Sequence, residues 1–559
     1  MAKSIGLYDV TENHPTGAAK LNWNTLDILA PQLIMLLTAA VITLVKKIAS
    51  GRPRSGAIMI GFTGMVIATL VQLRNYPSFF AGGSAALHGL SGQLVFDPMG
   101  WILTFSILLL ATAAILLRRL RNYSGHGDGR FCLLIILSTV GWSLMPIAAS
   151  FPVLAGCMLL GSLPLWMLST FGSRDGVRIP LTNKTLLVVL AVMLLALVPM
   201  TIRGVDFSGT RMVIPGWRAA AYPWAGILTV LFFLPMLFWA GSMPLHWWFG
   251  EAAAETPAEV GFFLLLVPYV GSMAALLRML FALDRNNSRV AGVVALAVAI
   301  VALMAAALYS LRALTQNNIR AVVGNLLGTL AAMILFTLGV AVSPQPLSVA
   351  HLVGCILLYA LTASLAVGLA LRIIDSGKPR LLGELSEWSK DKLLSALVLV
   401  LALLSLGGFP PTMGAIVRIA LLRAVEPVGE WPGVVFIMVN VLSMIVGGVA
   451  ALRVAAYVFL DTPESPVAIP PPSRRRKVRH RALGTLTLLL AASVINGTAL
   501  LAYRPIQHLT MAFMPTSAST TATVPNTPEP HGWKPIRKVQ RGRETLPPPA
   551  PGICLWFPK

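Results

Sequence analysis

The chain has 559 residues, of which 56% are hydrophobic and only 11% are charged, and its mean hydropathy is +0.77. A soluble domain carries about 25% charged residues, so the composition excludes a soluble globular protein and predicts an all-α polytopic membrane protein. The formal net charge is +22, but the basic residues cluster in short loops between apolar runs, which favours topology signals and headgroup contacts over nucleic-acid binding.

The apolar segments recur at a length that lets a helix cross about 30 Å of hydrocarbon. We predict about fourteen transmembrane helices, at 26–45, 56–73, 99–117, 131–150, 151–171, 184–202, 223–248, 258–282, 290–311, 321–341, 346–373, 391–424, 432–460 and 482–503. They divide the chain into a polar N-terminal segment (1–25), helices 1–3 (26–125), a first repeat of helices 4–8 (126–285), a second repeat of helices 9–13 (286–460), a Pro/Arg-rich inner loop (461–481), helix 14 (482–503) and an extended C-terminal tail (504–559).

The basic residues lie mainly in the odd-numbered loops, although the loop after span six also carries Arg203, Arg211 and Arg218. The odd-loop bases include Lys46, Lys47, Arg118, Arg119, Arg174, Arg178, Lys378, Arg380, Arg474, Arg475 and Arg476. Because positive loops remain inside, we expect both termini on the outer side, the periplasm or the intermembrane space.

Two predicted spans, the seventh and the twelfth, are interrupted by helix breakers. These breakers are Pro235, Gly241 and Pro244 in span seven, and Gly407, Gly408, Pro410 and Pro411 in span twelve. The two spans are five apart and therefore opposite in direction, which is typical of two inverted five-helix repeats with a broken helix in each. The alternative is that Gly and Pro are simply commoner in membrane helices.

Polar residues follow the break in span seven. His246 titrates near neutral pH, and Glu251 and Glu255 are four residues apart, so a proton role is possible for all three. The alternatives are a histidine that hydrogen-bonds a carbonyl of the broken helix, and glutamates in a solvated inner loop. Arg418, after the break in span twelve, can hold a fixed charge but cannot shuttle protons, since arginine stays protonated.

The cysteines and the short motifs give no sign of cofactor chemistry. Cys132, Cys157, Cys355 and Cys554 do not pair at metal-ligand spacing, and the sequence has no phosphate-binding loop, dinucleotide motif or HExxH. We therefore expect no metal site, no cofactor and no catalytic residue in this chain.

Several segments, in order, resemble the antiporter-like subunits of respiratory complex I, and NADH dehydrogenase subunit 2 (bacterial subunit N) most closely. These are LAPQLIMLL (29–37), FDPMGW (96–101), SLPLW (162–166), MPLHWWFGEAAAETPAEV (243–260), LTQNNIRAVVGNLLG (314–328), LSLGGFPPTMGAIVR (404–418) and LRVAAYVFL (452–460). The resemblance covers roughly residues 26–505.

The resemblance also identifies departures at the family's proton-relay positions. A glutamate is replaced by Leu159, lysines by Trp239 and Tyr269, a histidine by Leu330, and two further lysines by Arg320 and Arg418. Burial can bring lysine and glutamate into a relay, whereas leucine, tryptophan and tyrosine cannot serve that purpose near neutral pH and arginine can hold only a fixed charge. The remaining candidates along a proton path are His246, Glu251, Glu255, Arg320 and Arg418, the two arginines as fixed charges, and we expect the path to be weakened or absent.

The resemblance implies a core subunit of the membrane arm of NADH:quinone oxidoreductase, in a mitochondrial inner membrane or a bacterial plasma membrane. FMN, iron–sulfur clusters and quinone would then belong to other subunits. The partners would be neighbouring antiporter-like and small membrane subunits, with bound phospholipids such as cardiolipin. The alternatives are an independent cation/proton antiporter subunit and a non-transporting membrane scaffold.

Overall fold

The structure is a computed structural model, and it describes a defined part of the chain. The described residues are 23–48, 55–74, 87–89, 93–120, 127–169, 188, 191, 233–286, 288–341, 349–377, 381–385, 392–425 and 430–460. Contacts divide the chain into two compact units, Met1–Pro515 and Thr516–Lys559, and all described residues belong to the first. The predicted spans 184–202 and 482–503, the loop 461–481 and the tail 504–559 lie outside the described residues, apart from 188 and 191.

The N-terminal half of the described fold contains five long helices and a small hairpin. The helices are α1 (Trp23–Ile48), α2 (Ser55–Arg74), α4 (Pro98–Leu120), α5 (Asp128–Leu144), which continues into the 3-10 turn η1 (Met145–Ile147), and α6 (Phe151–Ser169). The antiparallel strands β1 (Leu87–Gly89) and β2 (Leu94–Phe96) pair Leu87 with Phe96. Three-residue strands fall below the length at which alternation shows in a sequence, so the hairpin is an addition to the predicted all-α fold.

The C-terminal half of the described fold contains both long helices and short half-helices. They are α9 (Trp248–Glu255), α10 (Ala258–Asn286), α11 (Ser288–Thr315), α12 (Ile319–Ala341), α13 (Val349–Gly377), α15 (Leu393–Gly407), α16 (Met413–Val425) and α17 (Glu430–Phe459), with the 3-10 turn η2 (Leu382–Leu385). Within the described ranges, ten helices are long and apolar enough to cross a membrane. A helical, multi-spanning fold is therefore confirmed, while the count of fourteen remains a prediction.

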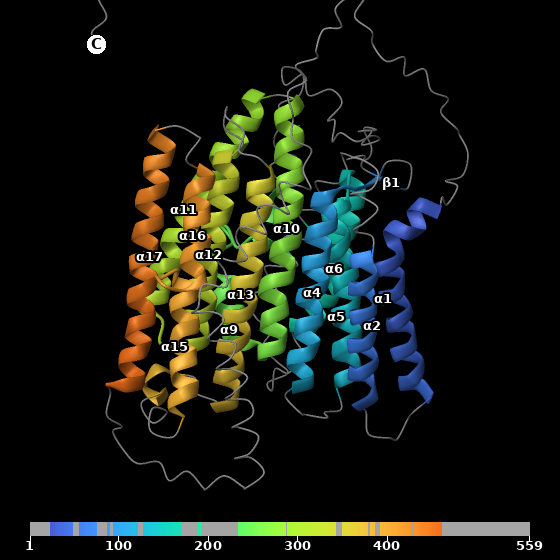
Figure 1. Cartoon of the computed structure of the whole chain (residues 1–559), viewed down its shortest axis with the longest axis horizontal. Helices are drawn as coiled ribbons and strands as arrows, with labels where there is room; N and C mark the ends of the chain where they lie inside the picture. Colours follow the sequence, from blue (N-terminus) through green and yellow to red (C-terminus); the bar gives the residue numbers. More distant parts are fainter. Residues whose placement is uncertain are drawn as a thin grey trace, which may run out of the picture. The chain divides into compact units, whose positions relative to one another are not determined.

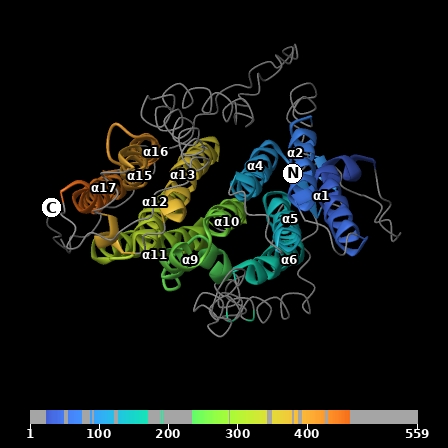
Figure 2. The ribbon, with the colours of Figure 1, turned by 90° about the horizontal axis from the view of Figure 1, so that it is seen from below.

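The helices stand side by side, and α10 lies between the two halves (Figure 1). Seen from below, α10 packs against α4 on one side and against α13 and α11 on the other (Figure 2). The apolar stretches of α10 and α12 are completely buried, whereas less than half of those of α1, α2, α11 and α17 is buried. Apolar residues on outer helices with no protein covering them are expected to face lipid or a neighbouring chain.

Both predicted helix breaks are confirmed, and they share one backbone arrangement. Gly241 and Gly408 have φ angles of +69° and +77°, which glycine adopts at no steric cost. Each glycine N–H donates to the carbonyl three residues earlier, and the next N–H donates to the carbonyl five residues before itself, so the ends of both half-helices are capped. A cis proline follows three residues after each glycine, at Pro244 and at Pro411.

The first broken span extends further than the sequence predicted. Residues 233–239 are helical, the chain turns over 240–247, and the helix restarts as α9. We predicted that the span would end at 248. The helix restarts because the segment from Trp248 to Glu255 is rich in alanine and no proline follows Pro244 until Pro257. Glu251 and Glu255 therefore lie on a half-helix and not in a loop.

Candidate functional site

The first break is held from across the bundle by a tyrosine of α11. The Tyr309 hydroxyl lies 2.9 Å from the Gly241 carbonyl oxygen and also donates to the His246 carbonyl oxygen. The tyrosine is fully buried, and its ring packs edge-on against the His246 imidazole. In a membrane interior, carbonyls freed by a break need such partners. Tyr309 therefore stabilises the break, a role that no motif in the sequence indicated.

Removing the Tyr309 hydroxyl tests directly whether its hydrogen bonds stabilise the first break. Tyr309→Phe keeps the ring but leaves buried carbonyls at the break without their donor, so we expect a loss of about 1–3 kcal/mol of stability. The measurement is the thermal unfolding midpoint of the purified protein. Tyr457→Phe on α17, where the ring lies under the Arg453 guanidinium, is the matched control and should change little. Equal unfolding midpoints for the two variants would contradict a stabilising role of the Tyr309 hydroxyl.

His246 is 6% exposed. The alternative to a proton role is an imidazole that hydrogen-bonds a carbonyl of the broken helix, and the backbone of Pro244 is a group that interacts with the ring. The backbone carbonyl of His246 itself accepts a hydrogen bond from Tyr309.

On α9, Glu251 is half-buried and Glu255 is exposed. Arg312, at the end of α11, is within electrostatic range of both Glu251 and His246. The structure thus brings these two predicted residues together with a cation that the sequence analysis did not single out. Arg312 precedes a short polar turn, but nothing in the sequence indicated that this turn faces the first break.

The positions of the substituted relay residues are filled by apolar and aromatic side chains. Trp239 is 1% exposed, and its ring centroid lies 5.2 Å from that of Trp142 and 5.5 Å from that of Trp248. The Tyr269 hydroxyl donates to the Ala331 carbonyl oxygen at 3.0 Å, while its ring contacts Tyr359.

Leu330 is completely buried in the same hydrophobic core, and Leu159 on α6 is half-buried against it. None of the four positions carries a carboxylate or an amine. The interior there is packed by side chains that do not ionise near neutral pH.

Arg418 lies at the second break and is fully buried, at 1% exposed. Its Nη1 donates to Asn440 Oδ1 and the Asn440 carbonyl oxygen, both at 3.1 Å, and to Ser443 Oγ at 2.6 Å. No carboxylate in the described ranges forms an ion pair with it, and its Nε and Nη2 have no hydrogen-bond partner.

The Arg418 guanidinium instead rests against Gly408, at the carbonyl end of α15. Since a helix carries partial negative charge at that end, the half-helix stabilises the cation in place of a carboxylate. The sequence analysis missed these two partners, although Asn440 and Ser443 stand three residues apart in the apolar middle of α17.

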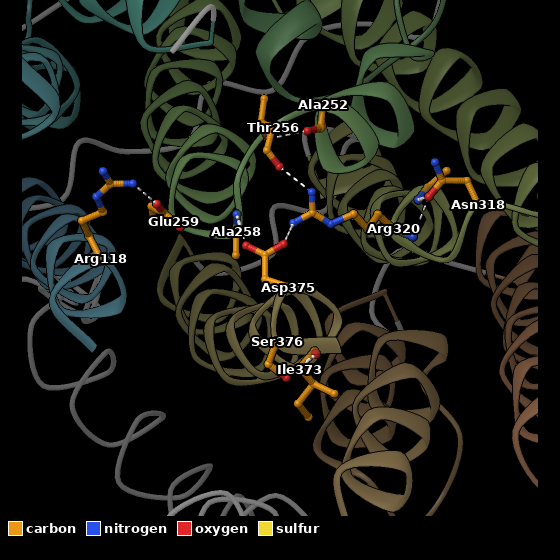
Figure 3. Close-up of polar contacts among 11 residues, drawn as sticks. Arg118, Ala252, Thr256, Ala258, Glu259, Asn318, Arg320, Ile373, Asp375 and Ser376 are labelled. Carbon is orange, nitrogen blue, oxygen red and sulfur yellow. Dashed lines mark hydrogen bonds and ion pairs between the residues drawn. The ribbon is translucent and has the colours of Figure 1, made fainter. Parts of the chain in front are cut away.

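Arg320, the remaining predicted residue, belongs to a different place. It begins α12 and forms an ion pair with Asp375 near the end of α13 (Figure 3). It also donates to the Thr256 carbonyl oxygen at 2.8 Å, and the second oxygen of Asp375 accepts the Ala258 N–H at 3.2 Å. Arg320 therefore fastens the junction between α9 and α10 to α12 and α13.

A second ionic cluster lies on the other side of that junction (Figure 3). Arg118 at the end of α4 donates to Glu259 at 2.6 Å and to Asp128 at 2.8 and 3.1 Å. Glu259 begins α10 and Asp128 begins α5, and both carboxylates are buried. In the sequence, Glu259 belongs to the segment 243–260 that carries the family resemblance. Among the residues with described positions, no group of three His, Cys, Asp or Glu could hold a metal ion.

Comparisons with known proteins agree with this architecture. Residues 160–445 match the family described as NADH:quinone oxidoreductase/Mrp antiporter, transmembrane. A protein from Streptomyces griseus named NADH-quinone oxidoreductase subunit N 1 is 27% identical over 394 residues, which cover 69% of this chain and 80% of that protein.

Two solved structures have a similar fold. A chain of respiratory complex I from Thermus thermophilus superposes with a TM-score of 0.64 at 20% identity, covering 84% of this chain and 98% of that one. A chain of the Mrp complex from Dietzia sp. superposes with a TM-score of 0.66 at 17% identity, covering 88% and 97%. The likeness of fold thus extends beyond the segment matched by the family.

Proposed function

Because this chain belongs to the NADH:quinone oxidoreductase/Mrp antiporter transmembrane family, we propose that it is a subunit-N-like component of the membrane arm of respiratory complex I. The name and the long coverage of the Streptomyces griseus relative support complex I over an independent cation/proton antiporter. The likeness to a chain of the Mrp complex is the observation that keeps the antiporter as the second candidate.

The assembled complex would oxidise NADH and reduce quinone, using FMN and iron–sulfur clusters carried by other subunits. This chain would supply contacts to neighbouring antiporter-like subunits, to small membrane subunits and to phospholipids such as cardiolipin. It would lie in a bacterial plasma membrane or a mitochondrial inner membrane, with both termini on the outer side, because its basic loops alternate along the sequence.

The proposal includes fourteen spans arranged with two inverted repeats. Support comes from the two breaks, which use the same glycine conformation, the same capping hydrogen bonds and the same distance to a proline. They stand in spans of opposite predicted direction, which is the arrangement that an inverted repeat produces.

Within the complex, the role of this subunit would be mainly structural, with a weakened proton path. The observation that carries this is the packed interior at Trp239, Tyr269 and Leu330, where side chains that do not ionise near neutral pH fill buried positions. Arg320 is held in an ion pair and Arg418 cannot release its proton. His246, Glu251 and Glu255 remain as candidates for a residual route around the first break.

Affinity purification of the tagged, full-length chain from its native membrane tests the assignment. We expect flavin- and iron–sulfur-containing subunits to copurify and the preparation to oxidise NADH with a quinone acceptor. Recovery with membrane subunits only, together with cation/proton exchange in vesicles, would instead establish the antiporter. Recovery of the chain alone, with neither activity, would favour the third alternative, a non-transporting membrane scaffold.

A further inference from the structure

Arg418 has one edge of its guanidinium that no group of the protein uses. All of its side-chain hydrogen bonds come from Nη1, which donates to Asn440 and Ser443 on α17. Nε and Nη2 have no hydrogen-bond partner, although the side chain is only 1% exposed. These two nitrogens form one edge of the planar group, and their parallel N–H bonds match an anion.

Three other arginines show how this chain uses the same edge. Arg118, Arg278 and Arg320 are 11%, 14% and 13% exposed, and each gives its Nη2 to an aspartate. Arg118 uses the whole edge, since its Nε and Nη2 both donate to Asp128 Oδ1, at 3.1 and 2.8 Å. Arg418 is more deeply buried than these three arginines, yet no carboxylate of the described ranges lies at this edge.

The helices around this arginine do not supply the matching negative charge. α16 packs against α12, α13, α15 and α17, and these five helices contain only two acidic residues, Asp375 and Glu430. Asp375 is bound by Arg320. Glu430 begins α17, about 15 Å along the helix axis from Asn440.

The two helix ends at the second break also leave the charge unbalanced. The end of α15 carries about half a negative charge, but the start of α16 carries about half a positive charge, and both ends meet at Gly408. Their contributions therefore offset one another. One full positive charge is left at the break, in a packed interior where an unpaired charge is costly.

We propose that the second break binds one small monovalent anion, such as chloride, on the Nε and Nη2 edge of Arg418. The ion would accept hydrogen bonds from both nitrogens and would balance the charge. Ser405 Oγ, in the last turn of α15, is buried without a partner and offers a further donor. A water molecule would satisfy the N–H groups but not the charge, and a lipid phosphate cannot reach a side chain that is 1% exposed.

The thermal unfolding midpoint of the purified protein, with all of its copurifying subunits, tests the proposal. The protein is purified throughout in chloride or in gluconate at equal ionic strength, because gluconate is too large for a packed interior. We expect chloride to raise the wild-type midpoint by about 2 °C, since a ligand that binds only the folded state stabilises it. Arg418→Met should show no such rise. Arg423→Met, on the exposed side of the same half-helix, should respond as wild type does.

An equal response to chloride in wild type and in Arg418→Met would overturn the proposal. If Arg418→Met fails to accumulate, crystals of the wild-type protein grown in bromide decide. An anomalous bromide peak beside Nε and Nη2 of Arg418 would support the site, and a water in that place would overturn it. Neither result depends on the complex I assignment, since both report on Arg418 whichever subunits copurify.

Discussion

Replacing Arg418 by alanine is expected to lower the stability of the protein by about 3 kcal/mol or more. The change opens a cavity beside Gly408 and leaves the Asn440 and Ser443 side chains without their shared donor. The measurement is the thermal unfolding midpoint of the purified protein. Arg423→Ala, on the exposed side of the same half-helix, is the control and should change stability by less than about 0.5 kcal/mol.

Two further substitutions at this position separate charge from volume. Arg418→Lys keeps a cation at the end of α15 but loses the fork of donors, so we expect an intermediate loss. Arg418→Met keeps much of the volume and removes a buried charge that no described carboxylate balances, so its cost should be smaller than that of alanine. If Arg418→Ala and Arg423→Ala lowered the unfolding midpoint equally, the assigned role of Arg418 would be wrong.

Placing a methyl group on either break glycine is expected to destabilise the protein by about 2–5 kcal/mol. At Gly408, φ is +77° and an added Cβ would come within 2.1 Å of Arg418 Nε. At Gly241, φ is +69° and the Cβ would come within 2.6 Å of the Phe249 ring. Both changes therefore combine a disfavoured backbone conformation with a clash in a packed interior.

Gly292→Ala on α11 is the matched control for these substitutions. An added Cβ there meets nothing within 4 Å, and alanine is the better helix former by about 1 kcal/mol. We expect this variant to unfold at or slightly above the wild-type midpoint. Wild-type stability of Gly408→Ala would show that the second break does not have the described conformation.

The sequence predicted the structure best where a long apolar run or a group of helix-breaking residues was present. Apolar runs located the long helices, and the glycines and prolines located both breaks. The restart of the helix at Trp248 was missed, because a polar stretch rich in alanine reads equally well as a loop or as a short helix. The β1–β2 hairpin was missed because its strands are too short to show a period.

The candidate site was predictable only in part, because a sequence shows the charged residues but not their partners. Arg118 and Glu259 meet across 141 residues, and no local pattern links them. Arg418 was noticed as a charge in an apolar run, yet its contacts with Asn440 and Ser443 depend on how α16 packs against α17. The substituted relay positions were located by family register, and their close packing became visible only in the structure.

The contacts of Arg418 also have a consequence for membrane insertion. A cation in the middle of a lone helix costs about 2.5–3.5 kcal/mol on insertion, whereas the leucine-rich α15 enters hydrocarbon readily. The hydrogen-bonding groups for that cation arrive only with α17, the next helix to be synthesised. The segment from Leu393 to Phe459 should therefore leave the translocon as one helical hairpin, in which α16 and α17 have already packed together before either helix is exposed to lipid.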